Sequence, residues 1–231
     1  MKIDIIVCYP TSCDFPLWRQ FIHDERSRFN KVIISFTETN QRPNLKDQIQ
    51  KLMIQDDCIL ITNRQLKGDD DWRNVGINQG LEYCNGDWVW FTEQDFMIKN
   101  IVFWEYVEKY HHDYVAFGVK QGDRIHPCCL FIQKKYLNSL NKDFSANPPR
   151  YDHFGAIQEQ IDKTNPFPQM PDDTYLHLNG LSSNWQLVQS GQEPNYRPEQ
   201  FRLWLAQNLK VNVPLIPSWK ETAREYLEKF T

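Results

Sequence analysis

Two carboxylates stand close together directly after a run of bulky apolar residues. Glu93 and Asp95 follow residues 88–92, Trp-Val-Trp-Phe-Thr, and such aromatic and β-branched side chains are typical of a strand buried on both faces. Residues two apart on an extended chain point to the same side, so the two carboxylates can act together. Carboxylate oxygens are hard ligands that suit Mg²⁺ or Mn²⁺, and these ions also take phosphate oxygens. The pair therefore predicts a divalent metal site that would neutralise a diphosphate leaving group.

Few other motifs in the sequence indicate a chemical function. The guanidinium of Arg73 could hold a diphosphate by a bidentate fork. The sequence contains no Gly-rich P-loop, Gly-x-Ser-x-Gly elbow or His-Glu-x-x-His pattern, which argues against the P-loop, hydrolase-elbow and zincin classes. Its six cysteines form no Cys-x-x-Cys pair, and no cysteine and histidine have the spacing of a zinc site. Cys128 and Cys129 precede an apolar run and are predicted to be small buried thiols.

The elements that must position these groups alternate regularly over roughly the first 140 residues. Short β-branched or aromatic runs predict strands, and amphipathic runs between them predict helices. The predicted strands cover residues 3–8, 32–36, 58–62 and 88–92, and the predicted helices begin near Pro16, Asn44 and Asp71. Asn85-Gly86 supplies the end of the third helix. This alternation predicts an α/β fold with a mainly parallel sheet sandwiched by helices.

The pattern changes beyond Asn100. Helices are predicted over 102–110 and 134–140, strands over 114–119 and 128–133, a further helix through Phe154, Ile157 and Ile161, and two amphipathic helices over 198–209 and 218–230. Proline-containing breakers lie at 143–150 and 165–173. We expect one α/β domain over residues 1–190 and a helical C-terminal extension over residues 191–231.

In α/β sheets of this kind, ligands bind beyond the carboxyl ends of the strands. Those ends hold Tyr9, Pro10 and Thr11 after the first predicted strand, Glu38 after the second, and Glu93 with Asp95 after the fourth. Tyr9 could stack on a nucleotide base, or it could be a packed loop aromatic. The same edge of the sheet therefore combines the predicted metal ligands with candidate nucleotide contacts.

Three short patterns follow one another between Asp71 and Phe96. Residues 73–77 read Arg-Asn-Val-Gly-Ile, residues 86–91 read Gly-Asp-Trp-Val-Trp-Phe, and residues 93–95 read Glu-Gln-Asp. In this order and spacing they resemble the core of family-2-type glycosyltransferases with the GT-A fold, in which an Asp-x-Asp motif stands where this chain has Glu93 and Asp95. The resemblance covers the layout of residues 1–135. It implies a GT-A, Rossmann-like sheet and transfer of a sugar from a nucleotide-diphosphate sugar to an acceptor hydroxyl, with Mn²⁺ or Mg²⁺.

The resemblance also implies roles for particular residues. The turn at Tyr9, Pro10 and Thr11 resembles the family's nucleotide-cradling turn. Glu38 follows the second predicted strand, where the family has an acidic residue that contacts the nucleotide base, and it could take that role. Arg73 and Asn74 would contact the donor, and Asp95 and Glu93 would hold the metal. Residues 1–100 would then form the nucleotide-sugar-binding half, and residues 101–190 the acceptor half.

His177 belongs to another segment that resembles a glycosyltransferase motif. It is followed by Gly180 and Trp185, a spacing similar to the His-x-x-Gly-x-x-Lys-Pro-Trp segment of retaining GT-A enzymes. That similarity implies that His177 is a third metal ligand, for which neutral imidazole favours Mn²⁺ over Mg²⁺. The alternative is a core histidine, because His177 stands between Leu176 and Leu178.

The general base has two candidates. Residues 151–162 faintly resemble the family segment whose aspartate is the base of inverting enzymes, but that position holds Gln160, which cannot be a base. Glu159 and Asp152 are the nearest carboxylates, and either could deprotonate an acceptor hydroxyl within hydrogen-bond reach. Alternatively, Glu159 lies on a solvated helix face. The stereochemistry stays open, since Glu159 favours inversion whereas His177 with Trp185 favours retention.

Composition limits the function classes further. Lys and Arg total 26 against 30 Asp and Glu, a net charge of −4, so no general basic field attracts nucleic acid. No stretch approaches the roughly 20 apolar residues of a transmembrane helix, and the cysteine usage favours the cytoplasm. The acceptor class is open among glycans, proteins, small molecules and modified nucleic acid. The alternatives to a glycosyltransferase are a nucleotidyltransferase and a degenerate, non-catalytic GT-A module that binds glycan or protein.

Overall fold

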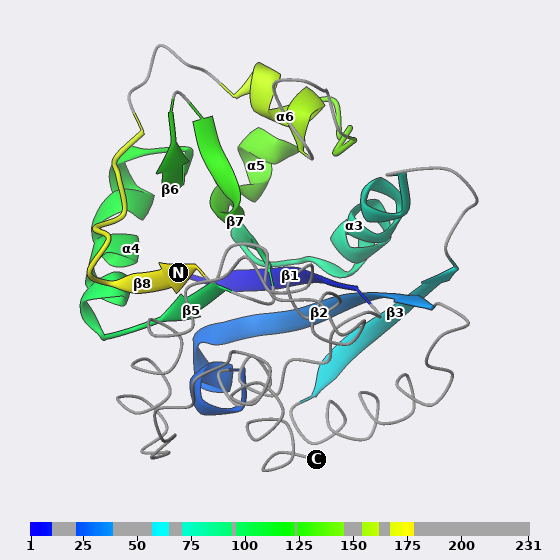
Figure 1. The fold of residues 1–231 in the computed structure, drawn as a ribbon, viewed down its shortest axis with the longest axis horizontal. Coiled ribbons are helices and arrows are strands. Elements are labelled where there is room, and N and C mark those ends of the chain that lie inside the picture. The colour runs from blue at the N-terminus through cyan, green and yellow to red at the C-terminus, as the bar shows by residue number, and fades with distance from the viewer. Residues whose placement is uncertain are drawn as a thin grey trace, which may run out of the picture.

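A six-stranded sheet forms the centre of the structure, a computed structural model (Figure 1). The structure describes residues 1–10, 22–38, 57–64, 71–93, 96–122, 124–145, 154–161 and 167–177. Across the sheet the strands run in the order β3 (Cys58–Arg64), β2 (Phe29–Glu38), β1 (Ile3–Pro10), β4 (Trp88–Glu93), β7 (Arg124–Gln133) and β6 (Ala116–Gln121). The first four are parallel, and β7 is antiparallel to both its neighbours. The prediction of a mainly parallel α/β sheet is confirmed.

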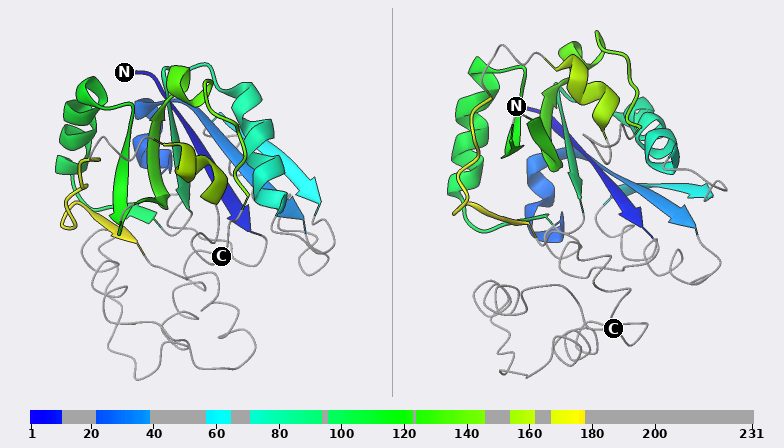
Figure 2. Two further views of the ribbon diagram at one scale, coloured as in Figure 1. Left: turned by 90° about the horizontal axis from the view of Figure 1, so that it is seen from above. Right: turned by 45° about the horizontal axis from the view of Figure 1, so that its top comes forward.

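Helices cover both faces of this sheet. One face packs against α3 (Asp71–Tyr83), α5 (Lys134–Leu137) and α6 (Gly155–Gln160). The other packs against α4 (Val102–Asp113) and against residues 22–25, which are helical and lead into the short 3₁₀ helix η1 (Arg26–Arg28). Figure 2 shows α3 and α4 at opposite ends of the sheet. The sheet is thus sandwiched between helices, as the alternation of elements in the sequence predicts.

Side chains along β4 alternate between the two faces and fill both cores. Trp88 and Trp90 lie in the hydrophobic cluster on the α4 side, whereas Val89 and Phe91 lie in the cluster on the α3 side. Trp90 is fully buried and stacks on Phe131 of β7, with ring centroids 4.9 Å apart. Because rings of this size bury large apolar areas, these tryptophans stabilise the sheet that carries Glu93 and are not available to stack on a ligand.

The buried carboxylate of Asp4 ties the end of α3 to the sheet. Asp4 is 0% exposed and accepts hydrogen bonds from the backbone N–H groups of Asn85 and Gly86, at 2.7 and 2.6 Å, and from the Asn30 side chain at 2.6 Å. A Cβ atom at Gly86 would lie 2.7 Å from the carbonyl oxygen of Lys2, so this turn requires glycine. The predicted stop of the helix at Asn85-Gly86 is therefore confirmed, and Asp4 fixes it.

Replacement of Asp4 by alanine is expected to lower the free energy of unfolding by about 3 kcal/mol, because it leaves buried N–H groups without their charged acceptor. Denaturant unfolding of the full chain measures the effect. Asp87→Ala, at an exposed neighbouring position, is the matched control and should change the stability by less than about 0.5 kcal/mol. Equal stabilities of the two variants would contradict the structural role of Asp4.

A two-stranded sheet joins the end of β4 to a distant part of the chain. It consists of β5 (Phe96–Ile98) and β8 (Tyr175–His177), which pair antiparallel with Phe96 opposite His177. The Lys99 N–H donates to the Thr174 carbonyl at 2.9 Å and continues the pairing. Neither strand is predicted from the sequence, since three residues are too few to show a periodicity. Their pairing brings His177 to the carboxyl end of β4.

Most predicted elements occur at the expected places with different ends. The strand predicted over 32–36 covers Phe29–Glu38, and the one predicted from 128 begins at Arg124. The prediction that a strand begins at Tyr114 is wrong, because Tyr114 caps α4 and β6 begins at Ala116. Several predictions lie outside the described residues. They are the helix near Asn44, most of the helix from Pro16, the two helices over 198–209 and 218–230, and the division at residue 190.

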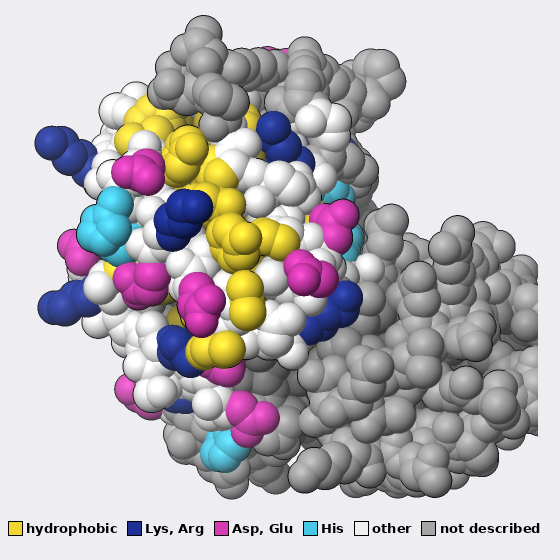
Figure 3. Space-filling model, turned by 90° about the vertical axis from the view of Figure 1, so that its left-hand side faces the viewer, with side chains coloured by type: hydrophobic (Ala, Val, Ile, Leu, Met, Phe, Trp, Pro, Cys, Tyr) yellow, Lys and Arg dark blue, Asp and Glu magenta, His cyan; other side chains and the backbone are white. Residues whose placement is uncertain are grey.

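The face formed by α4 carries both apolar and charged side chains (Figure 3). Ile101 and Val102 at the start of α4 and Val115 after its end are exposed hydrophobic residues. Glu108 and Lys109 are also exposed on this helix, so charged groups interrupt the apolar surface. Within the described ranges, no helix combines the length and apolarity needed to cross a membrane.

Candidate metal and nucleotide-sugar site

The carboxyl ends of three parallel strands meet at one edge of the sheet. Strand β1 lies between β2 and β4, and β1 and β2 end within one register position of each other. Of the predicted site residues, Tyr9, Pro10, Glu38 and Glu93 share this edge. Thr11 lies outside the described residues. The structure thus brings these four residues to one edge of the sheet, and nucleotide binding there stays a prediction.

Two predicted metal ligands contact each other at this edge. The Nε2 atom of His177 lies 3.2 Å from Oε2 of Glu93, although the residues are 84 positions apart. The side chains are 14% and 28% exposed, so a small ligand can reach them. The third predicted ligand, Asp95, lies outside the described residues. A carboxylate oxygen and an imidazole nitrogen are both donors that suit Mn²⁺, and a metal at this site stays a prediction.

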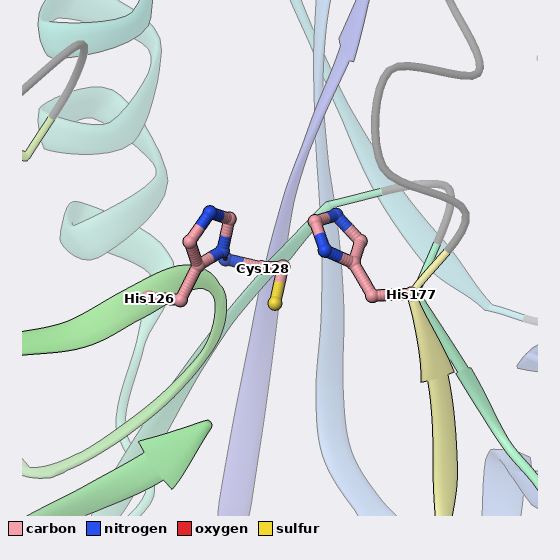
Figure 4. A group of neighbouring side chains, drawn as sticks. All are labelled: His126, Cys128 and His177. Carbon is pink, nitrogen blue, oxygen red and sulfur yellow. Dashed lines mark hydrogen bonds between the residues drawn. The ribbon is translucent and has the colours of Figure 1, made fainter. Parts of the chain in front are cut away.

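His126 and Cys128 extend this cluster on the side of β7. The His126 ring lies 5.0 Å from the His177 ring between centroids, at an interplanar angle of 55°. One donor atom from each of His126, Cys128 and His177 lies within 4.8 Å of the others, and Figure 4 shows both imidazole rings beside the thiol. Thr92 Oγ1 donates to the Cys128 carbonyl at 2.9 Å, which fixes Cys128 against the end of β4. No pattern in the sequence singles out His126.

Burial sets the protonation of two further groups near this edge. Complete burial, with Cys128 as neighbour, raises the pKa of the Cys129 thiol well above its usual value. Burial and a hydrogen bond to Asp172 raise the pKa of Tyr175, whose hydroxyl donates to Asp172 Oδ1 at 2.9 Å. Both groups are therefore protonated at neutral pH, and their roles are structural.

Arg73 and Asn74 lie in the first turn of α3, which follows β3. The N-terminus of a helix favours anions, because its first N–H groups point outward. The Asn74 side-chain oxygen accepts hydrogen bonds from Asn78 Nδ2 at 2.9 Å and from the Phe144 N–H at 3.0 Å. Asn74 therefore joins α3 to the segment after α5. Its contact with the nucleotide-sugar donor stays a prediction.

Solved structures share this architecture. The chain aligns with a mannosyltransferase from Pyrobaculum calidifontis in complex with GDP-Man and Mn²⁺, at a TM-score of 0.56 and 10% identity, over 97% of this chain and 68% of that chain. It also aligns with glucosyl-3-phosphoglycerate synthase from Mycobacterium tuberculosis, at a TM-score of 0.50 and 10% identity, over 84% and 81% of the two chains. No family model and no curated protein sequence matches the chain. The chain has a GT-A-type fold. At this identity, the likeness concerns the fold alone.

Helix α6 contains Glu159, one of the two carboxylates predicted as a general base. Glu159 is exposed on α6, and Asp152 lies outside the described residues. Gln160, at the position of the family's aspartate, binds the backbone of Asn141: its Oε1 accepts at 2.7 Å and its Nε2 donates at 3.0 Å. Gln160 is therefore a structural residue, and Glu159 keeps the exposure that a general base needs.

Proposed function

We propose that the chain is a glycosyltransferase that moves a sugar from a nucleotide-diphosphate sugar to an acceptor hydroxyl with a divalent metal. The contact between Glu93 and His177, at the carboxyl edge of a GT-A-type sheet, is the observation that carries the proposal. The two structural neighbours support it at the level of fold, since one was solved with GDP-Man and Mn²⁺ and the other with Mn²⁺ and UDP. The proposed catalytic domain covers residues 1–190.

Different residues at this edge of the sheet would bind the metal, the nucleoside and the phosphates. Glu93, Asp95 and His177 would hold Mn²⁺ or Mg²⁺, which supplies positive charge to the departing nucleoside diphosphate when bound. Tyr9, Pro10, Thr11 and Glu38 would contact the nucleoside. Arg73 and the N-terminus of α3 would hold phosphate oxygens, with Asn74 beside them. Catalysis would then depend on positioning and on fixed charges at the leaving group.

The histidine also favours one stereochemical course. Retaining GT-A enzymes are the class in which a histidine joins the metal ligands, and His177 lies in contact with Glu93. Gln160 offers no base at the position used by inverting enzymes. We therefore place the retaining course first, and assign Glu159 or Asp152 to deprotonation of the acceptor should the product be inverted.

Thermal unfolding with nucleoside diphosphates tests the proposal. GDP or UDP with Mn²⁺ is expected to raise the melting temperature of the full chain by about 5 °C at saturation, since ligand binds only the native state. His177→Ala should remove the shift, whereas His112→Ala, at an exposed position in α4, should keep it. No shift with any nucleoside diphosphate at millimolar concentration would contradict the proposal. Pyrophosphate release from a nucleoside triphosphate would support a nucleotidyltransferase instead.

A further inference from the structure

Strand β7 departs from regular pairing at the segment that contains His126 and Cys128. Gly118 of β6 pairs with Leu130, whereas Lys120 pairs with Ile125. One residue of β6 therefore faces four residues of β7, residues 126–129, which form a bulge in the strand. Bulges re-aim side chains and are common beside functional sites. Here the bulge holds two potential metal ligands two positions apart, beside the end of β4.

Hydrogen bonds and strand pairing hold the three side chains of the cluster close together. The Cys128 N–H donates to Nδ1 of His126 at 3.1 Å, so this nitrogen is unprotonated and its lone pair faces the cysteine. Thr92 Oγ1 holds the Cys128 carbonyl from β4, and the pairing of β8 with β5 holds His177. The Cys128 side chain is fully buried, and the His177 side chain is 14% exposed. Two imidazoles thus lie around a thiol that is shielded from bulk solvent (Figure 4).

The donor set determines the kind of metal. Two imidazole nitrogens and a thiolate favour Zn²⁺ and similar soft ions over Mg²⁺, Ca²⁺ or Mn²⁺, which prefer oxygen. In a tetrahedral zinc site, neighbouring donor atoms lie roughly 3.5 Å apart. The donors of His126, Cys128 and His177 all lie within 4.8 Å of one another, so about 1 Å of side-chain adjustment closes the site. A water molecule would complete the coordination.

We propose that His126, Cys128 and His177 form a binding site for a zinc-class divalent ion. The site does not depend on the proposed sugar transfer, which requires no sulfur ligand. On binding, the Cys128 thiol releases its proton to solvent, and His126 exchanges its hydrogen bond to the Cys128 N–H for a bond to the metal. His177 is shared with the proposed Mn²⁺ ligands, so the two kinds of ion compete for one imidazole.

Cobalt spectroscopy of the chelator-treated full chain tests this site without any nucleotide. Titration with Co²⁺ alone is expected to give thiolate-to-cobalt charge-transfer absorption that saturates at one ion per chain, and Zn²⁺ should abolish it. Binding at Glu93, Asp95 and His177 alone would give no such band, because that set contains no sulfur. A folded chain that shows no thiolate band with excess Co²⁺ would overturn the proposal.

Three variants identify the ligands. Cys128→Ser should remove the charge-transfer band, whereas Cys58→Ser should keep it, because Cys58 begins β3 at the far edge of the sheet. His126→Ala keeps the thiol and should weaken Co²⁺ binding at least tenfold, which tests the site even where Cys128→Ser fails to fold. Circular dichroism confirms the fold of each variant. A band that persists in Cys128→Ser, or unchanged affinity in folded His126→Ala, would assign the sulfur ligand elsewhere and overturn the proposal.

Discussion

Replacement of Glu93 by glutamine is expected to reduce metal-dependent donor turnover about a hundredfold. Glutamine has the size of glutamate, and its carbonyl oxygen can still accept a hydrogen bond from His177, whose Nε2 lies 3.2 Å from Glu93 Oε2. The change therefore removes the negative charge while it preserves the packing at the end of β4. Since Mn²⁺ and Mg²⁺ prefer charged oxygen ligands, the metal concentration for half-maximal turnover should rise together with the loss of rate.

Release of nucleoside diphosphate from a nucleotide sugar measures this effect without knowledge of the acceptor, because donor hydrolysis needs only water. Glu82→Gln is the matched control, since Glu82 is an exposed glutamate near the end of α3 and the variant should keep the wild-type rate. Equal turnover in the two variants across all metal concentrations would remove Glu93 from the metal site. The result is independent of Cys128, so it separates the proposed transferase site from the proposed zinc-class site.

The sequence predicts the sheet well, because its strands are buried on both faces. Residues 88–92 are continuously apolar or β-branched, and the structure places them in β4 with Glu93 at its end. Asn85-Gly86 is a helix-stop signal that can be read from the local sequence. The hydrogen bond from the Gly86 N–H to Asp4 joins residues far apart in the chain, so no local pattern predicts it. The place of Glu93 at the carboxyl edge therefore follows from sequence, whereas the groups that surround it do not.

The missed part of the site depends on contacts between distant segments. Strand β8 has three residues and exists through its pairing with β5, so His177 reaches Glu93 by a tertiary contact. His126 was missed because the strand was predicted to begin at residue 128, whereas β7 begins at Arg124. His126 and Cys128 lie in this one strand, but the bulge at residues 126–129 breaks the alternation of faces, so their proximity does not follow from the sequence. Zinc-spacing rules did not apply, since the third donor belongs to another sheet.

Replacement of Gly118 by alanine is expected to lower the free energy of unfolding by about 3 kcal/mol or more. A Cβ atom there would overlap the carbonyl oxygen of Cys129 and lie 2.8 Å from a methyl carbon of Ile125. Gly118 is buried, and its carbonyl accepts the Met170 N–H at 3.4 Å. The obstructing atoms on the Cys129 side are backbone, so relief requires β6 and β7 to separate at the start of the bulge.

Gly122→Ala provides the comparison for this substitution. Gly122 has φ +65° but no atom within 4 Å of an added Cβ, so alanine there meets backbone strain of about 1 kcal/mol without a steric clash. Denaturant unfolding should therefore rank Gly118→Ala well below Gly122→Ala in stability. Because β7 carries Cys128 and pairs with the strand that ends at Glu93, the Gly118 variant should also lose cobalt charge-transfer absorption where it remains folded. Equal stability of the two alanine variants would show that β6 and β7 are not in the close contact on which the position of Cys128 depends.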